Sequence, residues 1–155
     1  MNSKEIVLGS LYNMGKSEAQ ALRARAAAGD IDDTTIIDQE HAVPRWSKKN
    51  DYSKSPVGMP VKHDGQVYGL LQPHNASYYN ATPAELPALW RAKHTKDPKK
   101  AKAWIKPSST SDMYRAEECM IWTDGSVRRA KRDTAYSPEE YEYDWEVVEN
   151  QKEEN

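Results

Sequence analysis

The chain has 155 residues, a formal net charge of −2 and a calculated isoelectric point of about 6.1. Only 37% of its residues are hydrophobic and 30% are charged, which excludes one large core and favours small modules anchored by a few aromatic side chains. The charge balance excludes a broad basic surface for nucleic acid, and no apolar run reaches the roughly 18 residues of a membrane span. Residues 1–15 lack the apolar stretch of a signal peptide, so we expect the protein to be made in a cytoplasm.

The first 41 residues are predicted to be helical. Apolar periodicity, a capping-box pattern from Ser17 to Gln20 and a closing Gly29 indicate helices over residues 3–14, 18–28 and 33 to about 41. The second helix carries a narrow apolar seam at Ala19, Leu22 and Ala26. Two interpretations follow: the helices pack on their own module, or, as we favour, they form an assembly or docking device.

Beyond Trp46 the sequence becomes β-like, and one pattern occurs twice. A Trp is followed by a Tyr, a strand–turn–strand centred on Asp-Gly, a Pro, and a closing Trp seven residues after that Pro. The first copy runs Trp46, Tyr52, Asp64, Gly65, Pro83 and Trp90, and the second runs Trp104, Tyr114, Asp124, Gly125, Pro138 and Trp145. Asp-Gly between two β-type runs predicts a hairpin with a type I′ turn, because both central residues then take positive φ. The repeat indicates two small domains of one design.

The predicted fold is mainly β with N-terminal helices, and two small three-stranded β modules follow the helical segment in tandem. The expected parts are a helical assembly or docking segment, a first β module, a linker, a second and more divergent β module and a disordered tail, at residues 1–41, 42–91, 92–102, 103–148 and 149–155. The linker is rich in lysine, a composition typical of a solvated connection between domains.

The order of Trp, Tyr, Asp-Gly, Pro and Trp resembles the small carbohydrate-binding modules of families 5 and 12, also called type-3 chitin-binding domains. The resemblance covers residues 42–91 well and residues 103–148 less well. With the helical start and the phrase Ala88-Leu89-Trp90 between the modules, the layout is similar to short proteins of phage and prophage tail and structural modules. It implies a non-enzymatic, virion-associated protein that binds glycans by aromatic stacking and needs no cofactor.

In these families, sugar-stacking aromatics lie in the loop after the first Trp and at the end of the strand that follows the hairpin turn. The first position matches Tyr52 and Tyr114. The second has no aromatic in either copy, but Tyr78 and Tyr79 follow it closely in the first. The glycan-binding candidates are therefore Tyr52, Tyr78, Tyr79 and Tyr114, with Gln72, His74 and Asn75 as hydroxyl partners. The alternative for each tyrosine is a structural anchor, and recurrence at matching places favours core positions for Trp46, Trp90, Trp104 and Trp145.

The sequence gives no positive sign of catalysis or of a metal site. Adjacent carboxylates at Asp32-Asp33 and Glu139-Glu140 would point to different faces, so they are expected to be helix-start or surface charges. The four histidines lack metal-ligand spacing with one another or with Cys119, which is expected to be a buried, inert thiol. We therefore expect a protein that is not an enzyme.

Two main functions follow from these expectations. The first is a virion-associated protein that binds glycans on the bacterial surface. The alternative is a purely structural protein of a tail, baseplate or head, whose modules mediate oligomer packing and contacts with other virion proteins. The resemblance to phage proteins suggests a homotrimer in either case. A third and weaker class is an accessory domain separated from a hydrolase.

Overall fold

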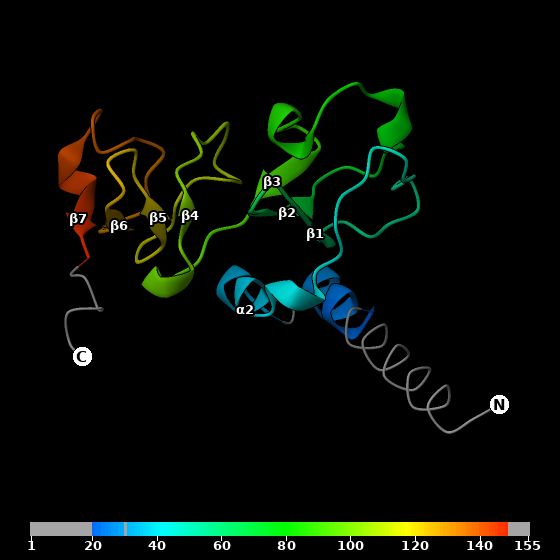
Figure 1. Cartoon of the computed structure of the whole chain (residues 1–155), viewed down its shortest axis with the longest axis horizontal. Coiled ribbons are helices and arrows are strands. Elements are labelled where there is room, and N and C mark those ends of the chain that lie inside the picture. Colours follow the sequence, from blue (N-terminus) through cyan, green and yellow to red (C-terminus); the bar gives the residue numbers. More distant parts are fainter. Residues whose placement is uncertain (1–19, 30, 149–155) are drawn as a thin grey trace.

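The computed structural model describes residues 20–29 and 31–148; the expectations for residues 3–14, Ser17, Ala19 and the tail lie outside these residues. The chain is mainly β, with a three-stranded and a four-stranded sheet that follow the N-terminal helices, which confirms the predicted fold class. The helices lie beneath the first sheet, and the second sheet lies beside the first along the longest axis of the molecule (Figure 1).

The N-terminal helices pack on the first module. Residues 20–28 are helical, and a short helix α2 follows at Asp33–Asp38, with a 3-10 turn η1 at Glu40–Ala42. The Asp32 side chain caps α2 by accepting from the Thr35 amide at 2.8 Å. The seam and α2 share one buried cluster with strand β2, and its members are Leu22, Ala26, Ile36, Ile37, Val43 and Val67. The first interpretation of the helices, packing on their own module, therefore holds for the seam residues that the structure describes.

The first sheet is antiparallel in the order β1-β2-β3, with strands at Pro60–His63, Gln66–Leu70 and Trp90–Ala92. The predicted type I′ hairpin is confirmed, because Asp64 and Gly65 both have positive φ, at 50° and 76°. Every residue of β2 is buried. Val67 packs against the helices, whereas Tyr68 and Leu70 pack into the aromatic core on the opposite face of the sheet. The middle strand is therefore covered on both sides.

The aromatic core of the first module is closed by loops and single turns. It contains Tyr52, Trp90 and the residues Met59, Val61, Tyr68, Leu70, Ala76 and Ala92. Two 3-10 turns, η2 at Ala76–Tyr78 and η3 at Pro83–Glu85, lead the chain back to β3. The carboxylate of Glu85 accepts from the amide and the hydroxyl of Thr82 at 3.0 and 2.9 Å, which fixes the start of η3.

The second sheet has the order β4-β5-β6-β7, with strands at Lys102–Ala103, Cys119–Ile121, Val127–Ala130 and Trp145–Val147. The expectation of three strands is corrected by β4, which pairs with β5 in parallel. The amide of Trp104 donates to the carbonyl of Ile121 at 2.9 Å, just as the amide of Trp46 donates to that of Lys62 at 2.8 Å. The same parallel contact therefore occurs in both modules, as a strand in one and a single bridge in the other.

The second hairpin differs from the prediction. Gly125 has a positive φ of 85°, but Asp124 does not have one. The amide of Trp122 donates to the carbonyl of Ser126 at 2.9 Å, which closes a three-residue loop. Asp124 accepts instead from the amide and the hydroxyl of Ser126. The turn is thus one residue longer than a type I′ turn and places the glycine alone in the left-handed region.

The connection between the modules begins with a buried segment, whereas Lys96, Lys99 and Lys100 beyond it are exposed. Lys93, His94 and Thr95 are all buried. The carbonyl of Thr95 accepts from the amide of Cys119 at 2.7 Å, so the connection borders the second sheet. Beyond Thr95, the chain forms a 3-10 turn η4 at Pro98–Lys100 before it enters β4. Among the lysines of this connection, Lys93 alone is buried, because its charge is matched by Asp33, which is far away in the sequence.

Candidate ligand-binding surfaces

The two tyrosines at the repeated position are structural. Tyr52 is 5% exposed and Tyr114 is 1% exposed, so neither ring offers a face to a ligand. Each hydroxyl accepts a hydrogen bond from a loop amide, that of Ser47 at 3.1 Å or that of Ile105 at 3.2 Å. These two glycan candidates are therefore corrected to core residues, because their rings are needed to close small cores that lack phenylalanine.

Each of these rings also meets the closing tryptophan of its own module. Tyr52 and Trp90 meet edge to face with centroids 5.1 Å apart, and Tyr114 and Trp145 do so at 5.3 Å. Both tryptophans are buried. Trp46 and Trp104 are half-buried and pack against the cores from the side. The structure thus places all four tryptophans as anchors, and Trp122 joins the second core by an edge contact with Trp104 at 5.9 Å.

The remaining candidates of the first module lie in the loop that contains η2. Tyr78 is 82% exposed, and Tyr79 is partly exposed with its ring edge-on to His74 at 5.6 Å. The polar candidates are engaged within the protein, and the exposed Gln72 donates its side-chain amide to the Ala88 carbonyl at 3.3 Å. The Asn75 side chain accepts from the Ser77 amide at 3.0 Å, and the buried His74 uses Nδ1 on the Gln72 carbonyl at 2.8 Å. The structure gives no ring contact between Tyr78 and Tyr79, so the loop offers one isolated aromatic face.

A larger aromatic surface lies in the second module, where sequence analysis did not place one. Tyr136, Tyr141 and Tyr143 are 57%, 46% and 67% exposed. The centroids of Tyr136 and Tyr141 are 6.3 Å apart, and those of Tyr141 and Tyr143 are 5.9 Å apart. We call these three residues the tyrosine surface. Three exposed rings, the middle one in contact with both others, form an apolar patch of the kind that marks interaction sites.

The backbone under the tyrosine surface is fixed by a network of hydrogen bonds. Ser137 and Glu140 form a reciprocal cap, in which each side chain accepts from the other's amide at 3.1 Å. The indole of Trp145 donates to the carbonyl of Tyr136 at 2.8 Å. A 3-10 turn η5 at Glu142–Asp144 then carries the chain into β7. The rings therefore project from a constrained turn, which lowers the entropy that binding would cost.

Arg132 forms one border of the tyrosine surface. Its guanidinium lies over the ring of Tyr141, 5.6 Å from the centroid, and its Nε donates to the buried carboxylate of Asp144 at 2.6 Å. The other oxygen of Asp144 accepts from the hydroxyl of Thr134 at 2.6 Å. One buried carboxylate thus holds both the arginine and the segment that leads to Tyr136.

The tyrosine surface was missed because the family positions lie elsewhere. Tyr141 is the third residue after Pro138, and the third residue after Pro83 is Leu86, so the aromatic is not repeated between the copies. One signal was available: three of the nine tyrosines fall between residues 136 and 143. Such local enrichment in a turn, where no strand demands an aromatic, indicates exposure.

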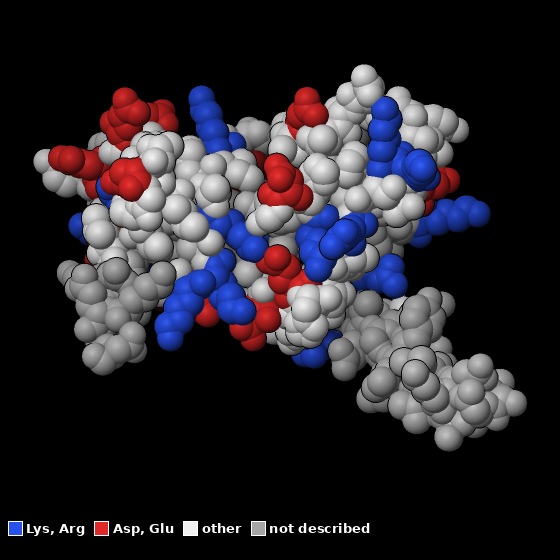
Figure 2. All heavy atoms as spheres, in the orientation of Figure 1, with Lys and Arg blue, Asp and Glu red and all other residues white. Residues whose placement is uncertain are grey.

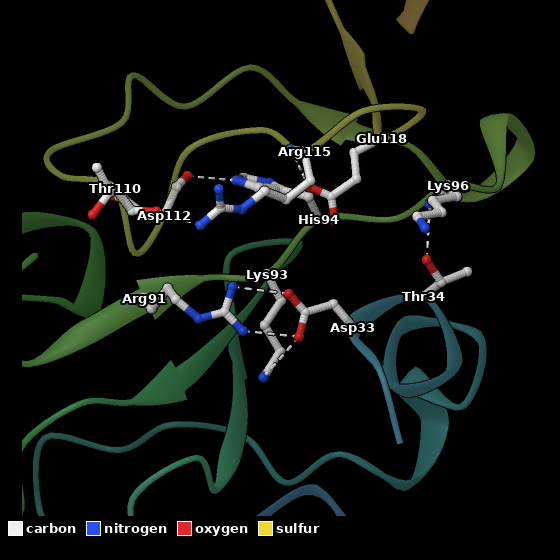
Figure 3. A network of polar contacts seen from close by, with 10 residues as sticks. All are labelled: Asp33, Thr34, Arg91, Lys93, His94, Lys96, Thr110, Asp112, Arg115 and Glu118. Atoms are coloured by element: carbon white, nitrogen blue, oxygen red, sulfur yellow. Dashed lines mark hydrogen bonds and ion pairs between the residues drawn. The ribbon is translucent and has the colours of Figure 1, made fainter. Parts of the chain in front are cut away.

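The largest set of perturbed titratable groups is structural and lies between the helices and the two modules (Figure 3). Arg91 binds Asp33 through two nitrogens, each at 2.8 Å, and Lys93 binds it at 3.1 Å. Burial opposes ionisation of Asp33, but its bonds to Arg91 and Lys93 outweigh burial and lower its pKa. Glu118, close by, has its pKa raised by burial. Of the two adjacent carboxylates, Asp32 therefore caps α2, and Asp33 forms the ion pairs with Arg91 and Lys93.

His94 is a second buried titratable residue of this region. Burial lowers its pKa from 6.5 to about 4, and the hydrogen bond from Nε2 to the Asp112 carbonyl at 2.8 Å opposes the shift only in part. The neutral imidazole stacks on Tyr114, whose pKa burial raises. Cys119 is buried and its pKa is raised by burial, which makes its thiol a poor nucleophile. These groups hold the modules together and face no open cleft in the structure.

Two comparisons of the sequence, with protein-family models and with curated proteins, found no match. Among residues 20–29 and 31–148, no three histidine, cysteine or carboxylate side chains are placed to hold a metal ion. Within the same part of the chain, no helix is long and apolar enough to cross a membrane.

Proposed function

We propose that this chain is a non-enzymatic binding protein that holds glycans on the tyrosine surface of its second module. The observation that carries the proposal is a row of three exposed rings on a constrained turn, in which Tyr141 contacts both Tyr136 and Tyr143. Pyranose rings present apolar C–H faces, which stack on flat aromatic side chains, while tyrosine hydroxyls and nearby polar groups bond the sugar hydroxyls. Binding of this kind changes no covalent bond.

The arrangement of the rings favours an extended glycan over a small buried ligand. The centroid separations of 6.3 and 5.9 Å place three rings in a row, with planes inclined by 43° and 66° between neighbours. A single monosaccharide would contact one or two of them, whereas a chain of sugars would contact all three. The isolated Tyr78 of the first module is a secondary contact at most, because no second ring extends it.

The sequence resemblance extends the proposal to a biological setting. The repeated framework is similar to carbohydrate-binding modules, and the layout with a helical start is similar to short phage and prophage proteins. We therefore place the protein in a virion, with bacterial surface glycans as its ligands and other virion proteins as its neighbours. The tertiary match between the two copies, from the tyrosine-to-amide bonds to the closing tryptophans, supports the repeat on which this resemblance rests.

The second candidate function is a structural virion protein whose modules pack against copies of themselves in a homo-oligomer. It is favoured by the edge strand β7, where Val147 is largely exposed close in sequence to Tyr143. An open strand edge beside exposed tyrosines would suit protein contact as well as sugar. A trimer would follow from the phage resemblance.

Binding of bacterial-surface polysaccharides and of chitin and peptidoglycan fragments, measured on an array and by calorimetry, tests the proposal. We expect the double variant Tyr136→Ala/Tyr141→Ala to lose at least about tenfold in affinity, since stacked aromatics contribute on the order of 1 kcal/mol each beyond their buried area. The control Tyr78→Ala, at an exposed ring of the first module, is expected to bind within about twofold of the unmodified chain.

Two outcomes would contradict the proposal. If no glycan binds, or if the double variant binds as well as the unmodified chain, the tyrosine surface is not a sugar site. Light scattering then separates the alternative. A stable oligomer that dissociates in Tyr136→Ala/Tyr141→Ala would assign the surface to contacts between copies.

A further inference from the structure

The chain contains the dipeptide Asp-Gly twice, at Asp64-Gly65 between β1 and β2 and at Asp124-Gly125 between β5 and β6. All four residues are exposed. In this dipeptide the main-chain nitrogen of the glycine can attack the side-chain carboxyl carbon of the aspartate, because glycine has no side chain that hinders the approach. The two hairpins therefore present the same reacting groups in two structural settings.

The second turn holds both reacting groups in hydrogen bonds. The amide of Gly125 donates to the carbonyl of Trp122 at 2.9 Å. The carboxylate of Asp124 accepts from the amide and the hydroxyl of Ser126 at 2.9 and 2.6 Å, and from the guanidinium of Arg128 at 3.2 Å. The bonds from Ser126, above all that from its hydroxyl, lower the pKa of Asp124. Its carboxyl group is therefore held in the ionised form, which is the poorer electrophile.

The first turn leaves the same groups free. In the type I′ turn the strand pairing resumes at His63 and Gln66, on either side of the two central residues. Within residues 20–29 and 31–148, neither the carboxylate of Asp64 nor the amide of Gly65 has a hydrogen-bond or ion-pair partner. Figure 2 shows charged side chains of both signs over both modules, so neither turn belongs to a module of a single charge sign. The difference between the turns therefore comes from their local contacts.

We infer that Asp64 is a site of spontaneous isomerisation to isoaspartate, and that the hydrogen bonds of the second turn protect Asp124 from the same reaction. The nitrogen of Gly65 forms a bond to Cγ of the protonated Asp64 carboxyl group, and the hydroxyl leaves with the amide proton as water. The product is a five-membered cyclic imide. Water then adds to one of the two imide carbonyls and the ring opens. One opening restores aspartate, and the other leaves the main chain running through the side-chain carboxyl carbon.

The isoaspartate would change the first module alone. It adds a methylene group to the main chain of the turn, so the type I′ geometry cannot be kept. Asp64 and Gly65 line a hollow together with Trp46 and His63, whose rings meet edge to face at 5.0 Å. The modification would therefore reshape this hollow. It is independent of the proposed glycan site, because the tyrosine surface belongs to the second module.

The test follows isoaspartate in the intact folded chain at about pH 6, where a small fraction of exposed aspartates is protonated. An isoaspartyl methyltransferase with labelled S-adenosylmethionine counts the product, and peptide mapping assigns it to one of the two turns. We expect isoaspartate to accumulate at Asp64 at least about fivefold faster than at Asp124, the factor that corresponds to one hydrogen bond of ordinary strength. In concentrated urea the two rates should become similar, because both turns are lost.

Two variants assign the difference to the named contacts. Ser126→Ala removes the hydroxyl bond to Asp124 and should raise the rate at Asp124 by about fivefold without changing the rate at Asp64. Asp64→Glu is the matched control, since its longer side chain would have to close a six-membered ring, and it should abolish the product in the first turn alone.

Three outcomes would overturn the inference. The first is a rate at Asp124 in the folded chain that equals or exceeds the rate at Asp64. The second is isoaspartate at Asp64 that appears in urea but not in the folded chain. The third is an unchanged rate at Asp124 in Ser126→Ala, which would remove the protective role of the hydrogen bonds. Since none of these measurements involves a glycan, they leave the proposed function to its own test.

Discussion

The rings of His94 and Tyr114 lie almost parallel, with centroids 3.7 Å apart and planes inclined by 17°. His94 belongs to the connection between the modules, and Tyr114 stands at the repeated tyrosine position of the second module. Tyr52, its counterpart in the first module, has no such stacked partner among the described residues and meets His74 at a tilt of 44°. The second core is therefore completed by a residue that precedes the module.

Stability should depend on pH through His94. The pKa of its imidazole falls from 6.5 in the unfolded chain to about 4 in the folded protein, so the unfolded state takes up a proton first as the pH falls. The contribution is fully present above about pH 6.5 and is lost progressively towards pH 4. We expect the free energy of unfolding to drop by about 2 kcal/mol between pH 7 and pH 5 from this group. Urea denaturation at the two pH values measures the drop.

The control for this prediction is His94→Gln, which can donate to the Asp112 carbonyl but does not titrate. Its free energy of unfolding at pH 7 should be lower, because the stacking on Tyr114 is lost. Its change between pH 7 and pH 5 should be smaller than that of the unmodified chain by about 2 kcal/mol. An equal change in both proteins would show that His94 is not the titrating group.

The ion pairs of Asp33 should be needed to hold α2 on the first module. Asp33→Asn removes the charge that compensates Lys93, whose side chain is only 5% exposed, and weakens the fork with Arg91. Leaving a buried charge without its partner costs about 3 kcal/mol, and the partial exposure of Asp33 places the expected loss at about 2 to 3 kcal/mol. Thermal and urea unfolding measure it. Asp38→Asn, on the exposed side of the same helix, should stay within about 0.5 kcal/mol of the unmodified chain.

The hydroxyls of the two repeated tyrosines should contribute equally to stability. Tyr52→Phe and Tyr114→Phe keep the rings but leave the loop amides of Ser47 and Ile105 without their acceptors. Each substitution should lower the free energy of unfolding by about 1 kcal/mol and leave glycan binding unchanged. Chemical denaturation and calorimetry on the same samples would check both halves. Loss of binding in either variant, with folding intact, would return these residues to the ligand site.

Alanine at the two hairpin glycines should be costly for conformational reasons alone. Gly65 and Gly125 have φ of 76° and 85°, and a Cβ at either would meet no atom within 4 Å. We expect Gly65→Ala and Gly125→Ala each to destabilise by about 1 kcal/mol, the cost of left-handed backbone for an L-residue. Asparagine, which tolerates this region, should recover part of the loss at both sites in the same unfolding assay. A neutral Gly125→Ala would show that the second turn rearranges freely.

The sequence predicted the parts of the fold that depend on local chemistry. The first Asp-Gly hairpin, the capping of α2 and the duplication of the tryptophan framework could all be anticipated, because each follows from residues close together in the chain. The buried connection could not, because it depends on Asp33 meeting Lys93 across 60 positions. The room for the Lys93 side chain also depends on a residue that is distant in the sequence. A Cβ on Gly69 would come within 3.0 Å of the Lys93 side chain, so this glycine makes room for the lysine.

The candidate site was harder to predict than the fold. Tyr52 and Tyr114 are tyrosines, the residue type that also stacks on sugars in binding sites. Only the three-dimensional structure shows that their hydroxyls accept from loop amides inside the cores. Conversely, Tyr141 and Tyr143 lie near the closing Trp145 in sequence, which suggests core positions, but the 3-10 geometry of η5 turns them outward. Whether an aromatic ring is an anchor or a platform depends on its partners, and these are not local.

The hydrogen bond from Cys119 to the carbonyl of Thr95 has a consequence for how the duplicated modules could separate in evolution. A gene cut between residues 95 and 102 would leave the second module without His94, whose ring stacks on Tyr114, and without Thr95, whose carbonyl accepts from Cys119. The core of the first module contains no residue between 93 and 102, so the loss falls on the second module. We therefore expect the second module to be stable only when this connection accompanies it.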